Sequence, residues 1–209
     1  MKILIIGGKG TIGKKVSDHF SKTHEIRIGG RSSGDVIVDI ADSKSIERMF
    51  ESIGNVDAVI CIAGDAKWAA FDSMTEKDFY IGLNSKLMGQ VNLVRIGQGY
   101  LNAGGSFTLT TGILADHPVV LTTSAAMVNG GIHSFVKAVS LELKNGIRIN
   151  AVSSGLVEDA VDKYEAYFPD HNPIPMKKVI KGYVKSVEGK ETGEIIRIYD
   201  IPSAIRSRD

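Results

Sequence analysis

The chain begins with residues 1–13, MKILIIGGKGTIG, an apolar run that leads directly into a glycine-rich loop. An isoleucine-rich run of this kind is typical of a strand buried on both faces, as in a parallel sheet covered by helices. The residues from about Ile12 to Ser21 follow the loop and predict an amphipathic helix. The stretch therefore predicts a strand, a tight turn and a helix, the repeating unit of parallel α/β proteins.

The loop carries Gly7, Gly10 and Gly13 at intervals of three residues. In such a strand–loop–helix unit the backbone N–H groups and the helix N-terminus face a pyrophosphate. Glycine suits these positions because a Cβ atom would hold the backbone away from the phosphates and the helix away from the strand. An ordinary glycine-rich turn is the alternative. The residues predicted to bind a dinucleotide here are Gly7, Lys9, Gly10, Thr11, Ile12 and Gly13.

The second predicted strand, His24 to Ile28, ends at a position that bears on the choice of cofactor. In dinucleotide-binding folds an acidic residue about twenty positions beyond the glycine loop binds the adenosine ribose. Gly30 occupies that position here, and Arg31 follows it. A guanidinium in place of a carboxylate favours a 2′-phosphate, so we predict NADP(H) rather than NAD, with Lys9 adding positive charge. The alternative for Arg31 is a solvated surface arginine.

Strands and helices continue to alternate along the rest of the chain. Apolar runs predict strands at 36–38, 57–62, 106–111, 147–152 and 194–199, and helices are predicted at about 44–53, 76–99, 123–144 and 176–187. Asp42 or Ser43 can accept from the free N–H groups that begin the helix at 44. This alternation predicts an α/β fold in three layers, a doubly wound parallel sheet with helices on both faces, as a single domain over residues 1–209.

Composition limits the partners and the compartment. The 209 residues carry a formal net charge of +1, which gives no reason to expect nucleic acid or an anionic membrane as partner. No apolar stretch is long enough to cross a bilayer, and residues 1–13 do not resemble a signal peptide. Cys61 is the single cysteine, so we expect a buried packing residue in a reducing cytoplasm. The histidines show no spacing typical of a metal site, and no metal is expected.

Several short motifs, in order and at matching spacing, make the chain resemble the short-chain dehydrogenase/reductase family over nearly its whole length. The glycine loop is similar to T-G-x-x-x-G-x-G, with Thr11 at the middle glycine, and residues 61–64, CIAG, stand at N-N-A-G. Residues 148–155, RINAVSSG, resemble R-V-N-x-V-x-P-G, and residues 192–194 resemble the T-G-Q before the last strand. The resemblance implies a Rossmann fold with seven parallel strands in the order 3-2-1-4-5-6-7.

The resemblance also implies roles for individual residues. Asp39 and Ile40 resemble the pair that contacts the adenine ring, and Ala63 and Gly64 are the part of the N-N-A-G signature that this chain keeps. Asn84 matches the asparagine that supports a proton-relay water. Family members commonly pair through the two long helices, so we expect a homodimer or homotetramer.

The departure from the family pattern falls on the catalytic residues. The family reduces carbonyls with a Tyr-x-x-x-Lys pair and a serine at the end of the fifth strand. Alignment through residues 124–129 places Ala125 at the tyrosine and Asn129 at the lysine, and Thr111 or Gly112 stands at the serine. The resemblance therefore implies most residues of the cofactor site but leaves the proton donor of the reaction unassigned.

The candidates for that chemistry are few. Thr111 can donate one hydrogen bond to a carbonyl, and Asn129 can bond the nicotinamide ribose. His117 lies in the loop after the fifth strand, near the expected substrate, with a solvated loop histidine as the alternative. His133 is expected to point away from the nicotinamide, as a packing or interface residue. The predicted catalytic residues are Thr111, Asn84, Asn129 and His117.

Two functions from different classes fit these features. The first is an NADP(H)-dependent oxidoreductase that acts on a small carbonyl or alcohol with an altered proton donor, because hydride transfer needs chiefly a positioned nicotinamide. A missing general acid would slow such a reaction by about 10²–10⁴-fold without abolishing it. The second is a protein that binds NADP(H) without turnover, as a sensor or regulator. A purely structural role would leave the glycine-rich loop unexplained.

Overall fold

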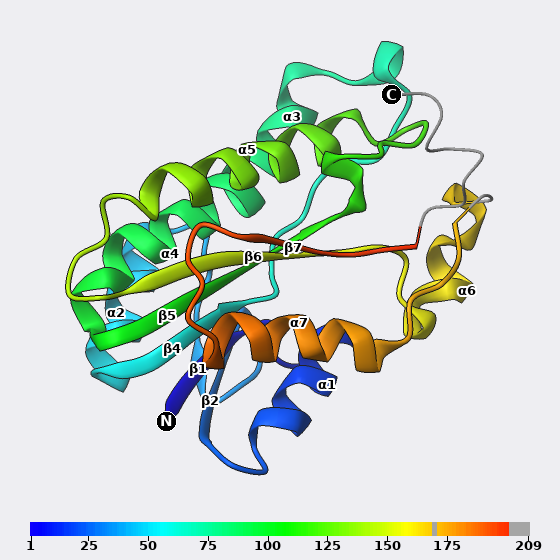
Figure 1. The fold of residues 1–209 in the computed structure, drawn as a ribbon. Coiled ribbons are helices and arrows are strands. Elements are labelled where there is room, and N and C mark those ends of the chain that lie inside the picture. Colours follow the sequence, from blue (N-terminus) through cyan, green and yellow to red (C-terminus); the bar gives the residue numbers. More distant parts are fainter. Residues whose placement is uncertain (169–170, 201–209) are drawn as a thin grey trace.

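The computed structural model describes residues 1–168 and 171–200, and the strands in this part form one seven-stranded sheet (Figure 1). The strand order is β3-β2-β1-β4-β5-β6-β7, and all neighbouring strands are parallel. The predicted class and strand order are confirmed, and residues 201–209 of the chain lie outside the described part. The strands are β1 (Lys2–Ile6), β2 (Glu25–Gly30), β3 (Val36–Ile37), β4 (Val56–Cys61), β5 (Leu101–Gly112), β6 (Arg148–Ser154) and β7 (Ile195–Ile198).

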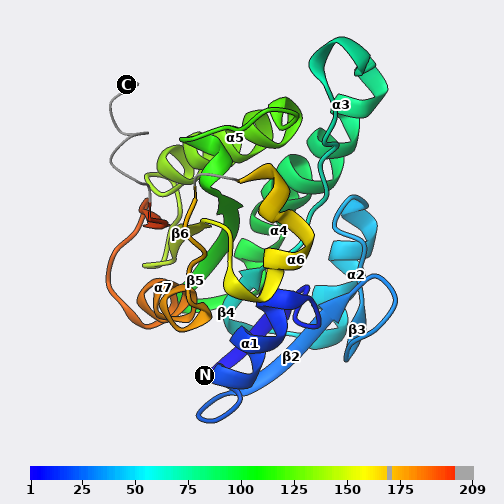
Figure 2. The same cartoon turned by 90° about the vertical axis from the view of Figure 1, so that its right-hand side faces the viewer.

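Helices cover both faces of the sheet, as the alternation predicts. They are α1 (Thr11–Phe20), α2 (Ser43–Ile53), α3 (Glu76–Gly82), α4 (Gly89–Gly97), α5 (Thr123–Val139), α6 (Val161–Tyr164) and α7 (Met176–Glu188). Figures 1 and 2 show α1 and α7 together on one face, with α2, α4 and α5 on the other. Asp42 caps α2 as predicted, because its Oδ1 accepts a hydrogen bond from the N–H of Lys44 at 2.9 Å.

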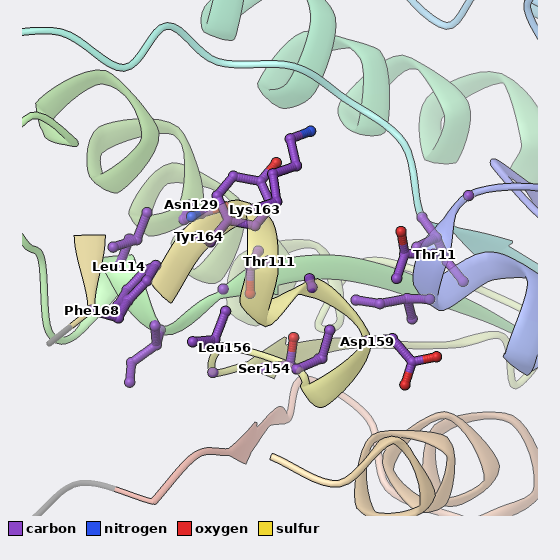
Figure 3. A pocket seen from close by; sticks show the side chains of 18 of the residues that line it. Thr11, Thr111, Leu114, Asn129, Ser154, Leu156, Asp159, Lys163, Tyr164 and Phe168 are labelled. Carbon is purple, nitrogen blue, oxygen red and sulfur yellow. The ribbon is translucent and has the colours of Figure 1, made fainter. Parts of the chain in front are cut away.

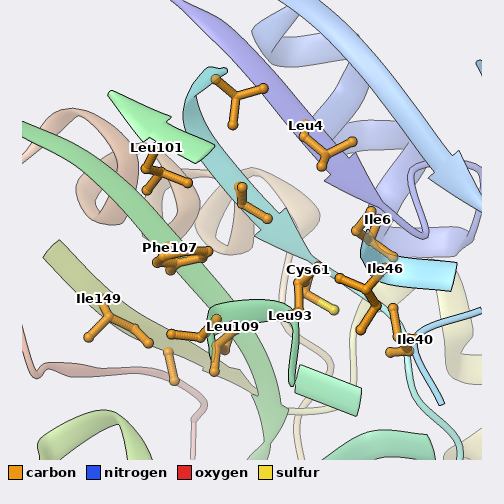
Figure 4. Packing of buried hydrophobic residues seen from close by; sticks show 14 of the residues in the cluster. Leu4, Ile6, Ile40, Ile46, Cys61, Leu93, Leu101, Phe107, Leu109 and Ile149 are labelled. Atoms are coloured by element: carbon orange, nitrogen blue, oxygen red, sulfur yellow. The ribbon is translucent and has the colours of Figure 1, made fainter. Parts of the chain in front are cut away.

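Two hydrophobic clusters, one on each face, hold the layers together. Side chains alternate along β1, so Leu4 and Ile6 pack with the residues of α2 and α4, while Ile3 and Ile5 pack with those of α1 and α7. Figure 4 shows the first cluster, which contains Cys61. Cys61 is fully buried, and burial raises the pKa of its thiol to about 11, so it is a packing residue as predicted.

The predicted helix at 76–99 is interrupted by a π-helical segment, Leu83–Met88, between α3 and α4. One of its glycines allows another helix to approach closely, because a Cβ on Gly82 would lie 3.2 Å from the Oγ atom of Ser124 on α5. A π-helical turn is wider than an α-helical one and changes which side chains face inward, and such turns occur often at functional sites. The interruption therefore changes which side chains of this helix face the sheet.

The second long helix, α5, ends at Val139, before its predicted end at Lys144. Separate turns lead on to Asn145 and Gly146, whose φ values are 57° and 69°. Asparagine and glycine adopt this left-handed conformation most easily. The two residues form the turn into β6.

Polar side chains at the start of β6 tie the last helix and the last strand to the sheet. The guanidinium of Arg148 donates to the carbonyl oxygens of Ser186 and Val187 at 2.8 Å each, at the C-terminal end of α7. The side chain of Asn150 donates to the carbonyl of Glu191, in the turn before β7. These bonds hold the chain in register as it enters β7, which has four residues. At the opposite edge of the sheet, β3 has two.

Two further observations concern the described ranges as a whole. None of their helices combines the length and the apolar character that crossing a membrane requires. They also contain no group of three or more His, Cys, Asp or Glu side chains that could hold a metal ion.

Candidate active site

Two adjoining cavities lie at the carboxyl ends of the central strands, where ligands bind in open parallel sheets. The larger, of about 440 Å³, extends from the glycine loop past the ends of β4, β5 and β6 to α6. The smaller, of about 300 Å³, lies beyond the ends of β1 and β2. Ile62 and Gly64 line both cavities, so one extended ligand can occupy them together.

The glycine loop combines two glycines that the backbone packing requires with one that faces the larger cavity. A Cβ on Gly7 would overlap with the carbonyl oxygen of Ile62, and one on Gly13 would overlap with that of Gly7. Gly10 lines the cavity, and a Cβ there would meet nothing closer than 3.4 Å. No side chain caps the start of α1, so Thr11 and the rest of its first turn, which also line the cavity, present N–H groups to an anion.

The smaller cavity contains most of the residues predicted for the adenosine half of a cofactor. Arg31 lies at its edge and forms an ion pair with Asp65 at 3.3 Å, in which both side chains are exposed. Lys9 is exposed and lines neither cavity. The smaller cavity thus has the Arg31 guanidinium beside it, at the position where the sequence predicts a 2′-phosphate. The predicted residues in its lining are Gly7, Arg31, Asp39, Ile40, Ala63 and Gly64.

Asn129 supplies a polar atom without a partner inside the larger cavity. It is 3% exposed on α5, and its Oδ1 accepts no hydrogen bond from the residues that the structure describes. A buried polar group in this condition costs about 1–3 kcal/mol, so the site gains from a ligand that donates a hydrogen bond there. A hydroxyl is such a donor, and the ribose of a dinucleotide carries hydroxyls. Asn129 therefore fits a bound nucleotide cofactor.

Thr111, at the end of β5, lines the larger cavity and contacts a histidine on its other side. Its Oγ1 is 2.9 Å from Nε2 of His133 on α5, and both side chains are buried. His133 is buried and lines neither cavity, which agrees with the expected packing role, but it reaches the site through its contact with Thr111. Residues four apart lie on one face of a helix, so His133 shares the face of Asn129. Burial lowers the pKa of His133 below its usual value.

Two of the predicted catalytic residues line neither cavity. Asn84 is exposed on the π-helix, and His117 packs edge-on against the ring of Tyr199, with the centroids 6.0 Å apart. Asp116, beside His117, is bound by Arg197 and by the hydroxyl of Tyr199. Burial alone would raise the pKa of Asp116, but these two partners hold it below its usual value. This polar group belongs to the supporting structure around β7.

Lys86 lines the larger cavity from the π-helix, and the sequence did not single it out. It is half-buried, and among the described residues its ammonium has no carboxylate within 4.0 Å and donates no hydrogen bond. Burial lowers the pKa of Lys86, while Cys61 and Asp65 oppose that shift. The spacing of small residues in the sequence could have indicated that Lys86 faces inward. Gly82 and Gly89 are small and buried, and Lys86 lies within one turn of both, so it falls on the face toward the sheet.

Apolar side chains close the far end of the larger cavity. Figure 3 shows Thr11 at the glycine-loop end and Leu114 with Phe168 at the other. The ring of Tyr164, on α6, lies 5.5 Å from that of Trp68, and both line the cavity. A wall of this kind favours an apolar substituent on the ligand.

The short helix α6 brings a tyrosine and a lysine to the cavity in a way that no sequence motif predicts. Lys163 and Tyr164 are adjacent, and the Nζ atom of Lys163 lies 4.9 Å from the centroid of the Tyr164 ring. Asp159 lines the same side and forms an ion pair with Lys15 at 3.2 Å. A phenol is thus present at the cavity, although Ala125 stands where the family has its tyrosine.

Comparison with known proteins agrees with the fold. The family model described as enoyl-(acyl carrier protein) reductase matches residues 14–182. The crystal structure of the protein lin1944 from Listeria innocua is 44% identical with a TM-score of 0.94, covering 95% of this chain and all of that one. A small-chain dehydrogenase in complex with NADPH is 27% identical with a TM-score of 0.84, covering 95% of this chain and 96% of that one.

A curated relative is similar over a shorter region. The short-chain dehydrogenase/reductase ucsE of Acremonium sp is 30% identical over 105 residues, which are 49% of this chain. The match spans 39% of that relative's length.

Proposed function

We propose that this chain, which belongs to the short-chain dehydrogenase/reductase family, uses NADP(H) to interconvert a small carbonyl compound and its alcohol. The observation that carries the proposal is the larger cavity. It begins at the glycine loop and contains a hydroxyl donor, Thr111, beside a buried acceptor without a partner, Asn129 Oδ1. The solved dehydrogenase that holds NADPH supports the choice of cofactor, as does the position of Arg31 at the smaller cavity.

Residues of both cavities would hold the cofactor. The first turn of α1 faces the pyrophosphate, Arg31 pairs with the 2′-phosphate, and Asn129 accepts from a hydroxyl of the nicotinamide ribose. When bound, the nicotinamide supplies or accepts the hydride. The residues assigned to the cofactor are Gly7, Lys9, Gly10, Thr11, Ile12, Gly13, Arg31, Asp39, Ile40, Ala63 and Gly64, with Lys9 as part of the loop rather than of the cavity lining.

The protein's own contribution to the chemistry comes from three side chains. Thr111 donates a hydrogen bond to the carbonyl oxygen and so stabilises the negative charge that develops on it. Lys86 brings to the cavity the positive charge that is lost where Asn129 replaces the lysine of the family pattern. The aromatic wall around Tyr164 excludes water and selects an apolar substituent. Asn84 and His117 have no part in this proposal, because they line neither cavity.

A second candidate function is the binding of NADP(H) without turnover, and Ala125 favours it. Ala125 is 5% exposed and packs in a cluster with the following apolar residues: Ile113, Leu114, Leu156 and Phe168. The position of the family's proton-donating tyrosine is therefore filled by core packing. A protein selected only to sense the cofactor would tolerate this arrangement.

One experiment separates the two candidates. Fluorescence titration with NADPH and NADH measures cofactor binding, and oxidation of NADPH is then followed with a panel of small apolar ketones and diketones. We expect tighter binding of NADPH than of NADH, and a turnover that falls in Thr111→Val while NADPH affinity is kept. Binding without turnover across the panel would favour the sensor, and failure to bind either cofactor would exclude both functions.

A further inference from the structure

Thr111 has the cavity on one side and an imidazole on the other, which makes its hydroxyl a connection between the two. Oγ1 of Thr111 lies 2.9 Å from Nε2 of His133, and Thr111 is 4% and His133 6% exposed. The contact joins the end of β5 to the cavity-facing side of α5. Buried contacts of this kind are strong because water does not compete for either partner.

We propose that His133 is the proton source of the site, acting through Thr111 on the oxygen of the substrate. The inference rests on the proposed function, since it names the group that replaces the missing phenol. His133 does not line the cavity itself, so it acts through another residue. It is a positioning and proton-supplying residue behind Thr111.

The hydrogen count at Thr111 explains why a hydrogen on Nε2 of His133 decides the outcome. The imidazolium always carries this hydrogen, and the neutral ring carries it in one of its two tautomers. A threonine hydroxyl has one hydrogen to donate and two lone pairs that accept. When Nε2 of His133 carries a hydrogen, it donates to Oγ1, and the Thr111 hydrogen is free for a ligand in the cavity. When Nε2 has no hydrogen, the Thr111 hydrogen is used by His133, and the hydroxyl can only accept from the ligand.

The charged groups around His133 come from three elements and act against one another. Burial is the largest influence, and it lowers the pKa of His133. Arg197 on β7 and Lys137 on α5 lower it further, whereas Asp116, after β5, raises it. Asp116 is already engaged by Arg197, so it compensates the imidazolium incompletely. Together these influences leave the pKa of His133 below its usual value, so acidic solution favours the imidazolium form.

The proposed step balances in the direction of reduction. The carbonyl carbon gains a hydride, for which NADPH is the reductant. The oxygen takes the hydroxyl proton of Thr111, and Thr111 takes the Nε2 proton of His133. The alcohol has gained one hydride and one proton, His133 is left neutral, and it regains its proton from solvent before the next turnover.

The direction of the hydrogen bond can be measured without any turnover. NMR titration of the imidazole resonances gives the pKa of His133 in the protein without ligand. If the imidazolium donates to Thr111, then Thr111→Val removes an acceptor from the charged form and lowers the pKa of His133. Thr111→Ser keeps the hydroxyl and should leave this pKa unchanged. A pKa that rises in Thr111→Val would show that Thr111 serves the neutral ring as a donor, and it would overturn the proposal.

Kinetics then test the catalytic part. His133→Leu should lower kcat by about 10²–10⁴-fold, the usual contribution of a proton donor, while NADPH affinity is kept. His133→Gln retains an amide N–H that can donate to Thr111, so it should keep more activity than His133→Leu and lose the rise of kcat toward acidic pH. A His133→Leu variant that is folded and as fast as the wild type would exclude His133 as the proton source and leave the proposed function standing. A wild-type protein that binds no NADPH would instead exclude the proposed function.

Discussion

The two cavities are built in different ways, although they adjoin at Gly64. The glycine loop and part of the smaller cavity depend on glycines, among them Gly7, Gly30 and Gly64, at which a Cβ would overlap with a neighbouring backbone atom. The larger cavity is formed by side chains from β5, the π-helix, α5 and α6. Cofactor binding therefore depends on backbone geometry that leaves little choice of residue, whereas the chemistry depends on side chains that a relative can exchange.

The sharpest test of this contrast replaces one glycine of the loop. Gly13→Ala places a Cβ against the carbonyl of Gly7, a backbone atom that cannot rotate away. We expect a loss of about 3 kcal/mol or more in the free energy of unfolding, measured by denaturant titration. Gly10→Ala is the matched control, because Gly10 has a φ of −74° and a Cβ there would lie at an ordinary contact distance of 3.4 Å from the Gly7 carbonyl oxygen. It should fold normally and bind NADPH less tightly, and equal stability of the two variants would contradict the contrast.

The next largest effect concerns the smaller cavity. Arg31→Ala removes the guanidinium proposed to pair with the 2′-phosphate, and a charge-assisted pair contributes about 1.5–3 kcal/mol. NADPH binding should weaken by roughly 10- to 150-fold, with NADH nearly unchanged, as measured by cofactor fluorescence. An equal loss for both cofactors would show that Arg31 only supports the fold.

A third test addresses the larger cavity, where a family-like residue is expected to fail. Ala125→Tyr places a phenol where a buried alanine packs in an apolar cluster with Leu114 and Phe168. We expect destabilisation by about 1–3 kcal/mol and no gain in carbonyl reduction. Calorimetry and NADPH oxidation measure the two quantities. A variant that is stable and faster than the wild type would show that the site still follows the family pattern.

The smallest effect comes from the ion pair between Arg31 and Asp65. Exposed pairs contribute about 0.2–1 kcal/mol, and this one must open when Arg31 binds a phosphate. Asp65→Asn removes both the competing partner and a negative charge near the ligand. NADPH affinity should rise by up to about 5-fold. Weaker binding would mean that Asp65 positions Arg31 for the cofactor.

The sequence predicts the fold almost completely because its signals are local. The alternation of apolar runs and helices predicts the parallel α/β class, and the family resemblance implies the seven strands in the observed order. Asp42 caps its helix as expected. The glycine loop is recognisable because its glycines recur at intervals of three residues directly after an apolar run, although the neighbour that requires Gly7 is Ile62, far along the chain. Where a signal depended on helix continuity, prediction was less accurate: the π-helix Leu83–Met88 interrupts a helix that the sequence presents as continuous.

The residues of the larger cavity are predicted only in part from the sequence. Thr111 and Asn129 lie in the cavity as predicted. Lys86 is not singled out by the sequence, and the contact of His133 with Thr111 is not predicted, because each depends on how a helix is rotated against the sheet. Tyr164 is brought to the cavity by a four-residue helix in a segment without clear periodicity. Contacts between elements far apart in the chain carry no local signal, so the sequence could not show them.

The edges of the sheet have a consequence for how the protein behaves in a crowded solution. A long, exposed edge strand offers free N–H and C=O groups to a strand from another molecule, and short edge strands are one way in which proteins avoid such aggregation. Here the edges are β3, with two residues, and β7, with four, and β7 is held in place by the side chains at the start of β6. Conditions that loosen Arg148 from α7 would therefore free β7 and expose the longer β6, whose seven residues would then be open to intermolecular pairing.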